Sequence, residues 1–339
     1  MDEILIAGII FIFILGICIG SFLNVVVLRA ISGESIVLPP SKCPKCQSPL
    51  KWYDNIPLLS YLILRGKCRS CHEPISIQYP IVEFSTGVMF VLTALYCVAT
   101  SSQITSIIQL LLKLVVLWVV TSSAIVMIVS DFKEKCVFTS HSFVFIFSAL
   151  LYAFIRNGIH LTFFNPDLIN ALIGMVVGVV LMEGIVGIFY LILKKRIFGE
   201  GDTYIVAGMG ALLGWKYLLL TIFLSVIVQA LCFITSFIGR LFREKSYKLL
   251  WCLLALVVLT LGLKLYTMFG DVYYDIVILL TVIVLILGVY CCLQILKSIR
   301  TKQDTDLTYL PFGPALLITT FLMHFFGHFI VHFLKAVLY

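Results

Sequence analysis

Charged residues are scarce in this sequence. They make up 12% of its 339 residues, about half the roughly 25% of an ordinary soluble domain, whereas hydrophobic residues make up 61%. So little charge excludes a soluble globular protein of this length. A broad basic surface with interleaved aromatics is also missing, because the aromatic residues lie inside apolar runs. We therefore exclude nucleic acid as a partner.

Long apolar runs are what the sequence has instead. A membrane-spanning helix needs about 20 such residues, and we expect spans near residues 4–28, 81–100, 105–130, 137–155, 168–193, 203–219, 220–240, 249–269, 275–297 and 310–335. The first run has neither a basic leader nor a signal cleavage site, so we expect it to be retained. The predicted fold class is an all-α polytopic membrane protein with about ten transmembrane helices.

The positions of the lysines and arginines predict how the spans are oriented in the membrane. The net charge of +7 is concentrated in loops that follow every second span. The positive-inside rule places these loops in the cytoplasm and the N-terminus outside, and such loops also contact membrane lipid. We predict three parts: the first helix (1–28), a folded cytoplasmic insertion (29–80) and a transmembrane domain (81–339) that contains two spans within residues 249–297.

Two pairs of cysteines lie in the predicted insertion. Cys43 and Cys46 form one C-x2-C motif, and Cys68 and Cys71 form the second. Each motif directs two thiolates at one ion, and two motifs complete a tetrahedron with no open position, which predicts a structural Zn²⁺ site. The alternative is two disulfides, which a reducing cytoplasmic location disfavours.

Two aspartates stand at the predicted ends of spans. Asp131 follows the third span, and Asp202 closes the motif Gly199-Glu200-Gly201-Asp202 before the sixth. The predicted topology places both at the cytoplasmic edge. Two carboxylates that share a site ionise unequally, so one can activate water while the other, protonated, polarises a carbonyl. The glycines let the backbone approach an extended substrate. The alternative is that both aspartates are interfacial acids that neutralise nearby lysines.

Further motifs give a resemblance to a known family. They are Gly20-Ser-Phe-Leu-Asn24, Trp52-Tyr53-Asp54-Asn55-Ile56-Pro57, Leu64-Arg65-Gly66-Lys67-Cys68, Tyr79-Pro80-Ile81-Val82-Glu83, the Gly-x-Gly-Asp motif, Ala207–Trp215 and Pro311-Phe312-Gly313-Pro314. These motifs cover most of the chain in the expected order. The sequence resembles the type IV prepilin peptidases, a family of membrane aspartyl proteases.

The resemblance implies a multi-pass enzyme of the bacterial inner membrane whose active site faces the cytoplasm. Its two catalytic aspartates correspond to Asp131 and Asp202, and Gly199, Glu200 and Gly201 correspond to the supporting motif. The implied substrates are prepilin-like proteins, which are cut after the glycine that joins a short basic leader to a hydrophobic helix. The sequence identifies neither the particular pilin nor an oligomeric state.

Many members of the family also methylate the new N-terminus with S-adenosylmethionine. The resemblance links that activity to the cysteine-bearing segment and makes Arg65 and Glu83 candidates to serve it. The alternative for Arg65 is a contact with a lipid headgroup, and the alternative for Glu83 is a salt bridge at the start of a span. The alternatives for the whole chain are a peptidase without methyl transfer, and a non-enzymatic transporter or assembly scaffold.

The sequence departs from the family pattern in three places. The Ile-Pro or Leu-Pro expected after Asp131 is absent, the lysine expected after Asp202 is replaced by Tyr204, and about 95 residues separate Trp215 from Pro311. None of these changes removes a catalytic carboxylate.

Two further features are outside the motifs. Glu183 lies in the middle of a span. His324, His328 and His332 share one helix face, where we expect buried packing rather than a metal site.

Overall fold

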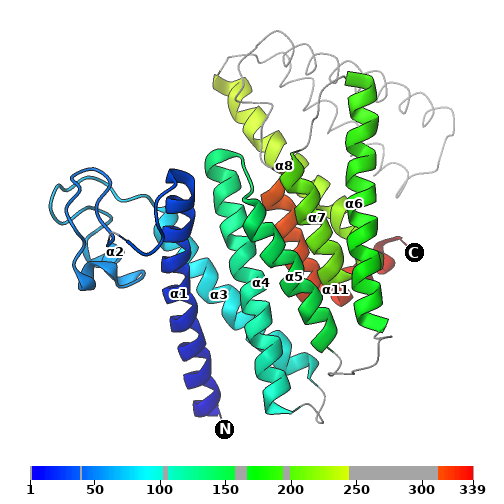
Figure 1. Cartoon of the computed structure of the whole chain (residues 1–339), viewed down its shortest axis with the longest axis horizontal. Coiled ribbons are helices and arrows are strands. Elements are labelled where there is room, and N and C mark those ends of the chain that lie inside the picture. Colours follow the sequence, from blue (N-terminus) through cyan, green and yellow to red (C-terminus); the bar gives the residue numbers. More distant parts are fainter. Residues whose placement is uncertain are drawn as a thin grey trace, which may run out of the picture. The chain divides into compact units, whose positions relative to one another are not determined.

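The computed structural model of the chain describes residues 2–38, 40–101, 106–156, 166–193, 199–243 and 312–338 (Figure 1). Its helices are α1 (Asp2–Ser32), the short η1 (Trp52–Asn55) and α2 (Leu59–Ile63), α3 (Gln78–Thr100), α4 (Ile107–Glu134), α5 (Thr139–Ile155), α6 (Pro166–Leu193), α7 (Glu200–Leu213), α8 (Trp215–Arg243) and α11 (Gly313–Leu338). The two additional spans predicted at 249–269 and 275–297 lie outside the described residues.

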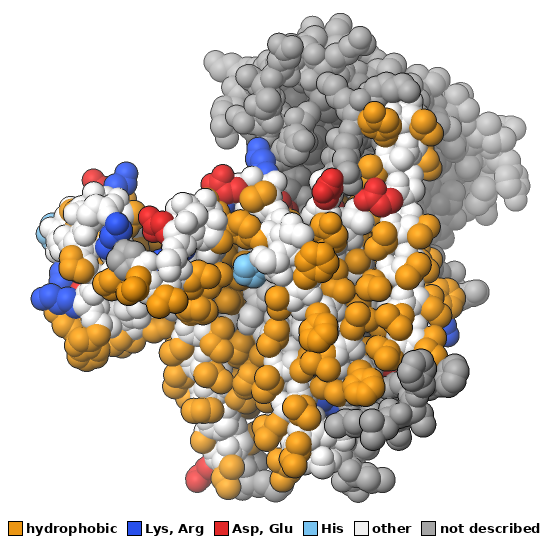
Figure 2. All heavy atoms as spheres, in the orientation of Figure 1, with side chains coloured by type: hydrophobic (Ala, Val, Ile, Leu, Met, Phe, Trp, Pro, Cys, Tyr) orange, Lys and Arg blue, Asp and Glu red, His pale blue; other side chains and the backbone are white. Residues whose placement is uncertain are grey.

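The described part of the chain is helical and apolar, as the composition predicted. Six of its helices, α1, α3, α4, α6, α8 and α11, are long and apolar enough to cross a membrane, and α5 is a shorter apolar helix. Figure 2 shows hydrophobic side chains covering the face made by α4, α5 and α6, while charged side chains gather at one edge. The chain is therefore a membrane protein with several spanning helices.

The predicted boundary between the sixth and seventh spans is wrong. We expected spans at 203–219 and 220–240, but α7 ends at Leu213 and α8 begins at Trp215. Gly214 separates them with a φ of 75°, a positive value that glycine adopts without strain. The 14 residues of α7 extend only about 21 Å at 1.5 Å per residue, which is less than the hydrocarbon thickness of about 30 Å.

The first predicted boundary also shifts. Helix α1 continues to Ser32 and α3 begins at Gln78, so the segment between them is shorter than the predicted 29–80. Helices α1 and α3 pack closely because glycines face each other: a Cβ on Gly16 would lie 2.7 Å from the Cα of Gly87. Small residues at such contacts are a common means of packing membrane helices.

Two hydrophobic clusters fix the helices around the site. One joins α1, α3 and the second half of α4 through residues such as Val27, Val82 and Val126. The larger one joins α4, α5, α7 and α11 and includes Leu117, Phe145, Met209 and Leu317, all fully buried. The end of α4 is therefore held between the α1–α3 pair and the α7–α11 pair.

The contacts within the chain divide it into two compact units. The first comprises residues 1–225 together with 311–339, and the second comprises residues 226–310. The site described below lies within the first unit. Within it, the short segment with η1 and α2 lies beside the C-terminal end of α1 (Figure 1).

Candidate active site and metal centre

Asp131 lies in the last turn of α4 and is 6% exposed. Among the described residues, its Oδ2 atom is buried without a hydrogen-bond partner. A buried carboxylate oxygen that lacks a partner is unfavourable for stability. A group held in this way at a membrane edge is typical of a functional acid.

Asp202 lies in the first turn of α7, and its backbone N–H donates to the Gly199 carbonyl over 3.2 Å. The carboxylate of Asp202 is close enough to act electrostatically on that of Asp131. Helix packing therefore brings together two carboxylates that are separated by 71 positions in the sequence. The juxtaposition suits the shared-site chemistry expected for the pair.

A third element closes this site from α11. A Cβ on Gly313 would lie 2.6 Å from Asp131 Oδ2 and 3.0 Å from Ile205 Cδ1 of α7. Only a residue without a side chain fits between these two atoms. The motif that contains Gly313 therefore contacts the aspartate site directly, which the sequence analysis did not predict.

The two motif glycines differ in their surroundings. A Cβ on Gly201 would lie 2.7 Å from Val137, so this glycine permits the α4–α5 connection to approach α7. A Cβ on Gly199 would meet only the Gly201 backbone nitrogen, at 3.9 Å. Gly199 is the N-cap of α7, and Glu200 beside it is exposed.

Glu183 supports α7 from the neighbouring helix α6. The Thr203 hydroxyl donates a hydrogen bond to Glu183 Oε1 over 2.8 Å. Because Thr203 follows Asp202, this bond fixes the turn that carries the catalytic candidate. Tyr204, the departure from the family pattern, contacts Phe143 of α5 with a ring-centroid distance of 5.7 Å.

The four predicted zinc ligands meet outside the helical bundle. The Sγ atoms of Cys43, Cys46, Cys68 and Cys71 all lie within 4.8 Å of one another, and those of Cys43 and Cys71 are 3.9 Å apart. A tetrahedron with Zn–S bonds of about 2.3 Å places sulfurs roughly 3.8 Å apart, whereas a disulfide needs about 2.05 Å. The residues fit a zinc ion, and they do not form disulfides.

Both cysteine turns are built in the same way. The Cys43 N–H donates to the Ser48 carbonyl and the Cys68 N–H donates to the Glu73 carbonyl. The residues that follow the second cysteine of each turn, Gln47 and His72, have φ values of 59° and 57°. Residues 41–50 and 66–75 are thus a local structural repeat, which the sequence analysis missed.

The pKa values of two thiols in the quartet are shifted in opposite directions. Hydrogen bonds with the side chain and backbone of Ser48 lower the pKa of the Cys46 thiol to about 6, so it ionises readily. A backbone hydrogen bond at Glu73 lowers the pKa of the Cys71 thiol. Desolvation and the neighbouring thiols outweigh this effect and raise that pKa to about 12. The four sulfur atoms could hold one metal ion, and a set of four cysteine ligands suits zinc.

We expect one zinc ion per chain in purified protein. Cys68→Ser should remove it, because three thiolates and a hydroxyl bind zinc far more weakly. Metal content by plasma mass spectrometry checks this, with Cys97→Ser as the control, since Cys97 is buried in α3 away from the quartet. Zinc retained in full by Cys68→Ser would contradict this site.

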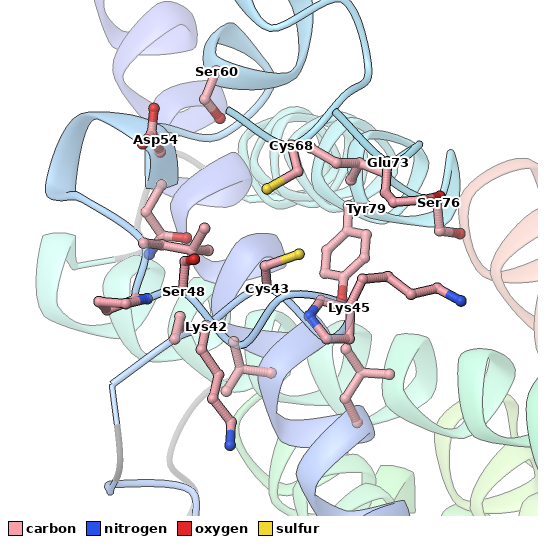
Figure 3. A pocket seen from close by; sticks show the side chains of 18 of the residues that line it. Lys42, Cys43, Lys45, Ser48, Asp54, Ser60, Cys68, Glu73, Ser76 and Tyr79 are labelled. Atoms are coloured by element: carbon pink, nitrogen blue, oxygen red, sulfur yellow. The ribbon is translucent and has the colours of Figure 1, made fainter. Parts of the chain in front are cut away.

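The two methyltransferase candidates lie in different environments. Glu83 of α3 is 6% exposed, and its Oε2 accepts a hydrogen bond of 2.8 Å from the Leu58 N–H. It lines a cavity to which Cys43 and Cys68 of the quartet also contribute. Figure 3 shows these two cysteines with other side chains that line the cavity. Arg65 is exposed, has a φ of 51° and does not line that cavity. Of the two candidates, only Glu83 lines this cavity.

The three histidines of α11 do not converge. His324 is buried against Tyr96 and Tyr152, with ring-centroid distances of 4.6 and 5.6 Å. His328 and His332 lie 4.9 Å apart. The predicted buried packing is confirmed for His324 and wrong for His328 and His332, which are exposed. Among the described residues, the cysteine quartet is the group that could hold a metal ion.

Comparisons with known proteins agree with the motifs. The bacterial peptidase A24 N-terminal domain matches residues 14–97, and the type IV leader peptidase family matches residues 118–234. A Klebsiella pneumoniae protein named prepilin leader peptidase/N-methyltransferase is 32% identical over 63% of this chain and 89% of its own length. The chain belongs to the type IV leader peptidase family.

Other relatives in the type IV leader peptidase family carry the same name. A Myxococcus xanthus protein is 34% identical over 62% of this chain, which spans 57% of that relative, and a Neisseria gonorrhoeae protein is 30% identical over 63% of this chain and 77% of its own length. No solved structure matches the chain. Both aspartates and all four cysteines fall inside the matched ranges, whereas Gly313 does not.

Proposed function

We propose that this chain is a prepilin leader peptidase whose catalytic pair is Asp131 and Asp202. The observation that carries the proposal is the meeting of two carboxylates from α4 and α7 at one end of a membrane bundle, with Oδ2 of Asp131 buried and without a partner among the described residues. Interfacial acids that merely neutralise lysines would instead be solvated or paired.

The pair supports hydrolysis by water. The ionised carboxylate takes a proton from water, whose oxygen attacks the scissile carbonyl, while the protonated carboxyl donates a hydrogen bond to the carbonyl oxygen. The C–N bond then breaks, and a proton passes from the pair to the leaving amine. The products are a leader with a new carboxylate and a mature protein with a free amine. No covalent enzyme intermediate is formed.

The charge distribution supports a cytoplasmic site. The basic residues Arg29 and Lys133 lie at the ends of α1 and α4, and both line the cavity that adjoins the zinc segment. The positive-inside rule assigns such an end to the cytoplasmic side of the bacterial inner membrane.

We propose that Glu200, exposed beside Asp202, contacts the basic leader of the substrate, with Gly199 and Gly201 shaping the approach.

The names of the relatives also include N-methyltransferase. We propose that this chain uses S-adenosylmethionine to methylate the amine released by cleavage, with the zinc quartet holding the cytoplasmic segment and Glu83 and Arg65 serving the transfer. In such a transfer the donor's S–CH₃ bond breaks, the N–CH₃ bond forms, the amine loses a proton to water, and sulfur keeps the bonding electron pair.

Product analysis tests both activities together. Detergent-purified wild type is incubated with a prepilin-like substrate and S-adenosylmethionine, and the mature product is sequenced by mass spectrometry. We expect cleavage after the glycine and one methyl group on the new N-terminus. Cleavage without a methyl group would leave a peptidase alone, and intact substrate with a folded, zinc-bound chain would favour the scaffold interpretation.

Glu183 gives a test of how Asp202 is positioned. Glu183→Leu removes the acceptor for the Thr203 hydroxyl. Thr203 is buried, and leaving its hydroxyl without an acceptor costs about 1–3 kcal/mol, so we expect kcat to fall about tenfold with KM unchanged. Glu183→Gln keeps an acceptor oxygen and should stay within about threefold of the wild type. Equal kcat values for the leucine variant and the wild type would show that this bond does not position the site.

A further inference from the structure

The segment between α1 and α3 carries an exposed apolar surface, which we call the apolar edge. It is made by Trp52 of η1 and by Leu59, Leu62 and Ile63 of α2. Trp52 is 80% exposed and Leu62 71%, although both are large hydrophobic side chains. An exposed group of such residues marks a surface that binds a partner or a membrane.

The apolar edge has one direction. Leu59, Leu62 and Ile63 recur at i, i+3 and i+4 and therefore share one face of α2. Helix α2 and η1 contact each other, which brings Trp52 to the same part of the segment. Figure 2 shows hydrophobic side chains gathered along the lower side of this segment, to the left of α1, whereas Lys and Arg side chains lie higher on it and at its outer side.

A hydrogen bond fixes the position of α2 along α3. The backbone N–H of Leu58, the N-cap of α2, donates to Glu83 Oε2 over 2.8 Å. Glu83 is buried and lies five residues after Gln78, where α3 begins, which is about 8 Å along the helix at 1.5 Å per residue. Because α3 is long and apolar enough to cross a membrane, the start of α2 lies beside the first turns of a spanning helix.

The lipid-facing surfaces of α1 and α3 reach the same depth. A Cβ on Gly20 of α1 would lie 2.8 Å from the Cα of Glu83, so these parts of the two helices are side by side. Near them, Phe22, Ile81 and Phe84 are all more than half exposed. The apolar edge therefore lies at the level of side chains that contact lipid in a spanning pair of helices.

Two exposed lysines flank the apolar edge in the sequence. Lys51 precedes Trp52, and Lys67 follows α2. Neither forms an ion pair within the described part of the chain. Lysines beside an apolar surface extend their ammonium groups to lipid phosphates, and tryptophan is enriched at the same interface. A soluble protein partner would instead have to reach a surface that lies at the depth of lipid.

We propose that the apolar edge is an interfacial anchor, inserted into the adjacent leaflet of the membrane that the chain spans. Its occupant is the headgroup and upper acyl region of that leaflet, with lipid phosphates at Lys51 and Lys67. Amphipathic elements lie in this region with their apolar face about 5–10 Å deep, and α2 is offset by about 8 Å along α3. The anchor holds the zinc segment against the membrane, and it depends on neither of the proposed activities.

Quenching of tryptophan fluorescence by brominated lipid tests the proposal. The full chain is placed in phosphatidylglycerol nanodiscs whose acyl chains are either ordinary or brominated near the glycerol. Wild type and Trp52→Phe differ by one exposed side chain, so the difference between their emissions reports Trp52. We expect brominated lipid to lower this difference emission by at least about half, because bromine quenches on contact and the apolar face lies at acyl depth.

Glu34→Trp in the Trp52→Phe background is the matched control. Glu34 is exposed and follows Ser32, the end of α1. The Asn24 amide donates to the Tyr79 carbonyl at the start of α3, and α1 continues eight residues beyond Asn24, about 12 Å at 1.5 Å per residue. A tryptophan at position 34 therefore lies outside the bilayer, and brominated lipid should change its emission by less than about a tenth.

Leu62→Asp supplies a second test. Leu62 is largely exposed, so the substitution removes little packing, whereas a carboxylate at acyl depth is unfavourable. We expect quenching of Trp52 to fall at least about twofold, and Leu62→Met, which stays apolar, to keep the wild-type value. Each variant is made with and without Trp52→Phe, and its zinc content establishes that the segment is folded.

Trp52 emission that brominated lipid leaves unchanged would overturn the anchor. If that emission were also at the wavelength of a water-exposed tryptophan, the apolar edge would face solvent. If it were shifted to shorter wavelength, a second copy of the chain or another protein would cover the edge instead. Equal quenching in Leu62→Asp and wild type would likewise contradict the proposal, because Trp52 would then reach lipid without the face of α2.

Discussion

Asp131→Asn and Asp202→Asn are each expected to lower the rate of prepilin cleavage at least about 1,000-fold, because general acid–base catalysis contributes about 10²–10⁴ and asparagine can neither accept the proton from water nor supply one to the amine. The substitutions conserve shape, so the folded structure should survive. The measurement is single-turnover cleavage in detergent with enzyme in excess.

Asp167→Asn is the matched control. Asp167 is also an aspartate near a helix end, but it pairs with Arg156 over 2.6 Å where α5 ends and α6 begins. We expect this variant to cleave within about threefold of wild type, since a part-exposed ion pair contributes about 0–1 kcal/mol. Residual activity of more than about a tenth in either catalytic variant would refute the assignment of the pair.

Gly313→Ala is expected to lower cleavage about 100-fold. Its new methyl group would lie 2.6 Å from Asp131 Oδ2, so the carboxylate or α11 must move. A displacement of about 1 Å at a catalytic group can cost about 100-fold in rate. The change should appear in kcat, while zinc content stays at the wild-type value because the cysteine quartet lies in the segment between α1 and α3.

Gly327→Ala supplies the control on the same helix. A Cβ there would meet only the terminal methyl of Met323, at 3.5 Å, which is an ordinary contact. This variant should cleave like wild type, since alanine also has a higher helix propensity than glycine. If both alanine variants were fully active, Gly313 would have no role in seating Asp131.

Much of the fold follows from composition and periodicity. The apolar runs predicted helices over α1, α3–α6, α8 and α11, because a chain with 12% charge has few places to turn outside the membrane. The break at Gly214 was misplaced because α7 and α8 have continuous hydropathy across it. A single residue with a positive φ ends the helix, and hydropathy averages over such a residue.

Part of the candidate site could also be predicted from the sequence. Carboxylates at span ends and C-x2-C pairs have local signatures, so Asp131, Asp202 and the four cysteines could be selected from the sequence. The contact of Gly313 with Asp131 joins positions 182 residues apart, and nothing local marks it. The repeated turns at 41–50 and 66–75 were detectable, since C-x2-C followed by a polar residue, a second polar residue and proline occurs in both.

Arg65 and Glu83 show where motif resemblance reaches its limit. Both lie in family motifs, yet only Glu83 is buried and lines the cavity. Burial depends on how α3 packs against α1 and the zinc segment, which no single motif encodes. Lys133 reaches the cavity for the same reason, although it belongs to no motif of the resemblance.

The most direct test of the central claim is cleavage of a prepilin-like substrate by the purified wild-type chain, with the masses of both products measured. The account predicts a leader that ends in glycine and a mature protein that begins with the next residue, and both products should be absent with Asp131→Asn. Intact substrate after incubation with folded, zinc-bound wild type, or the same cleavage by Asp131→Asn, would contradict it.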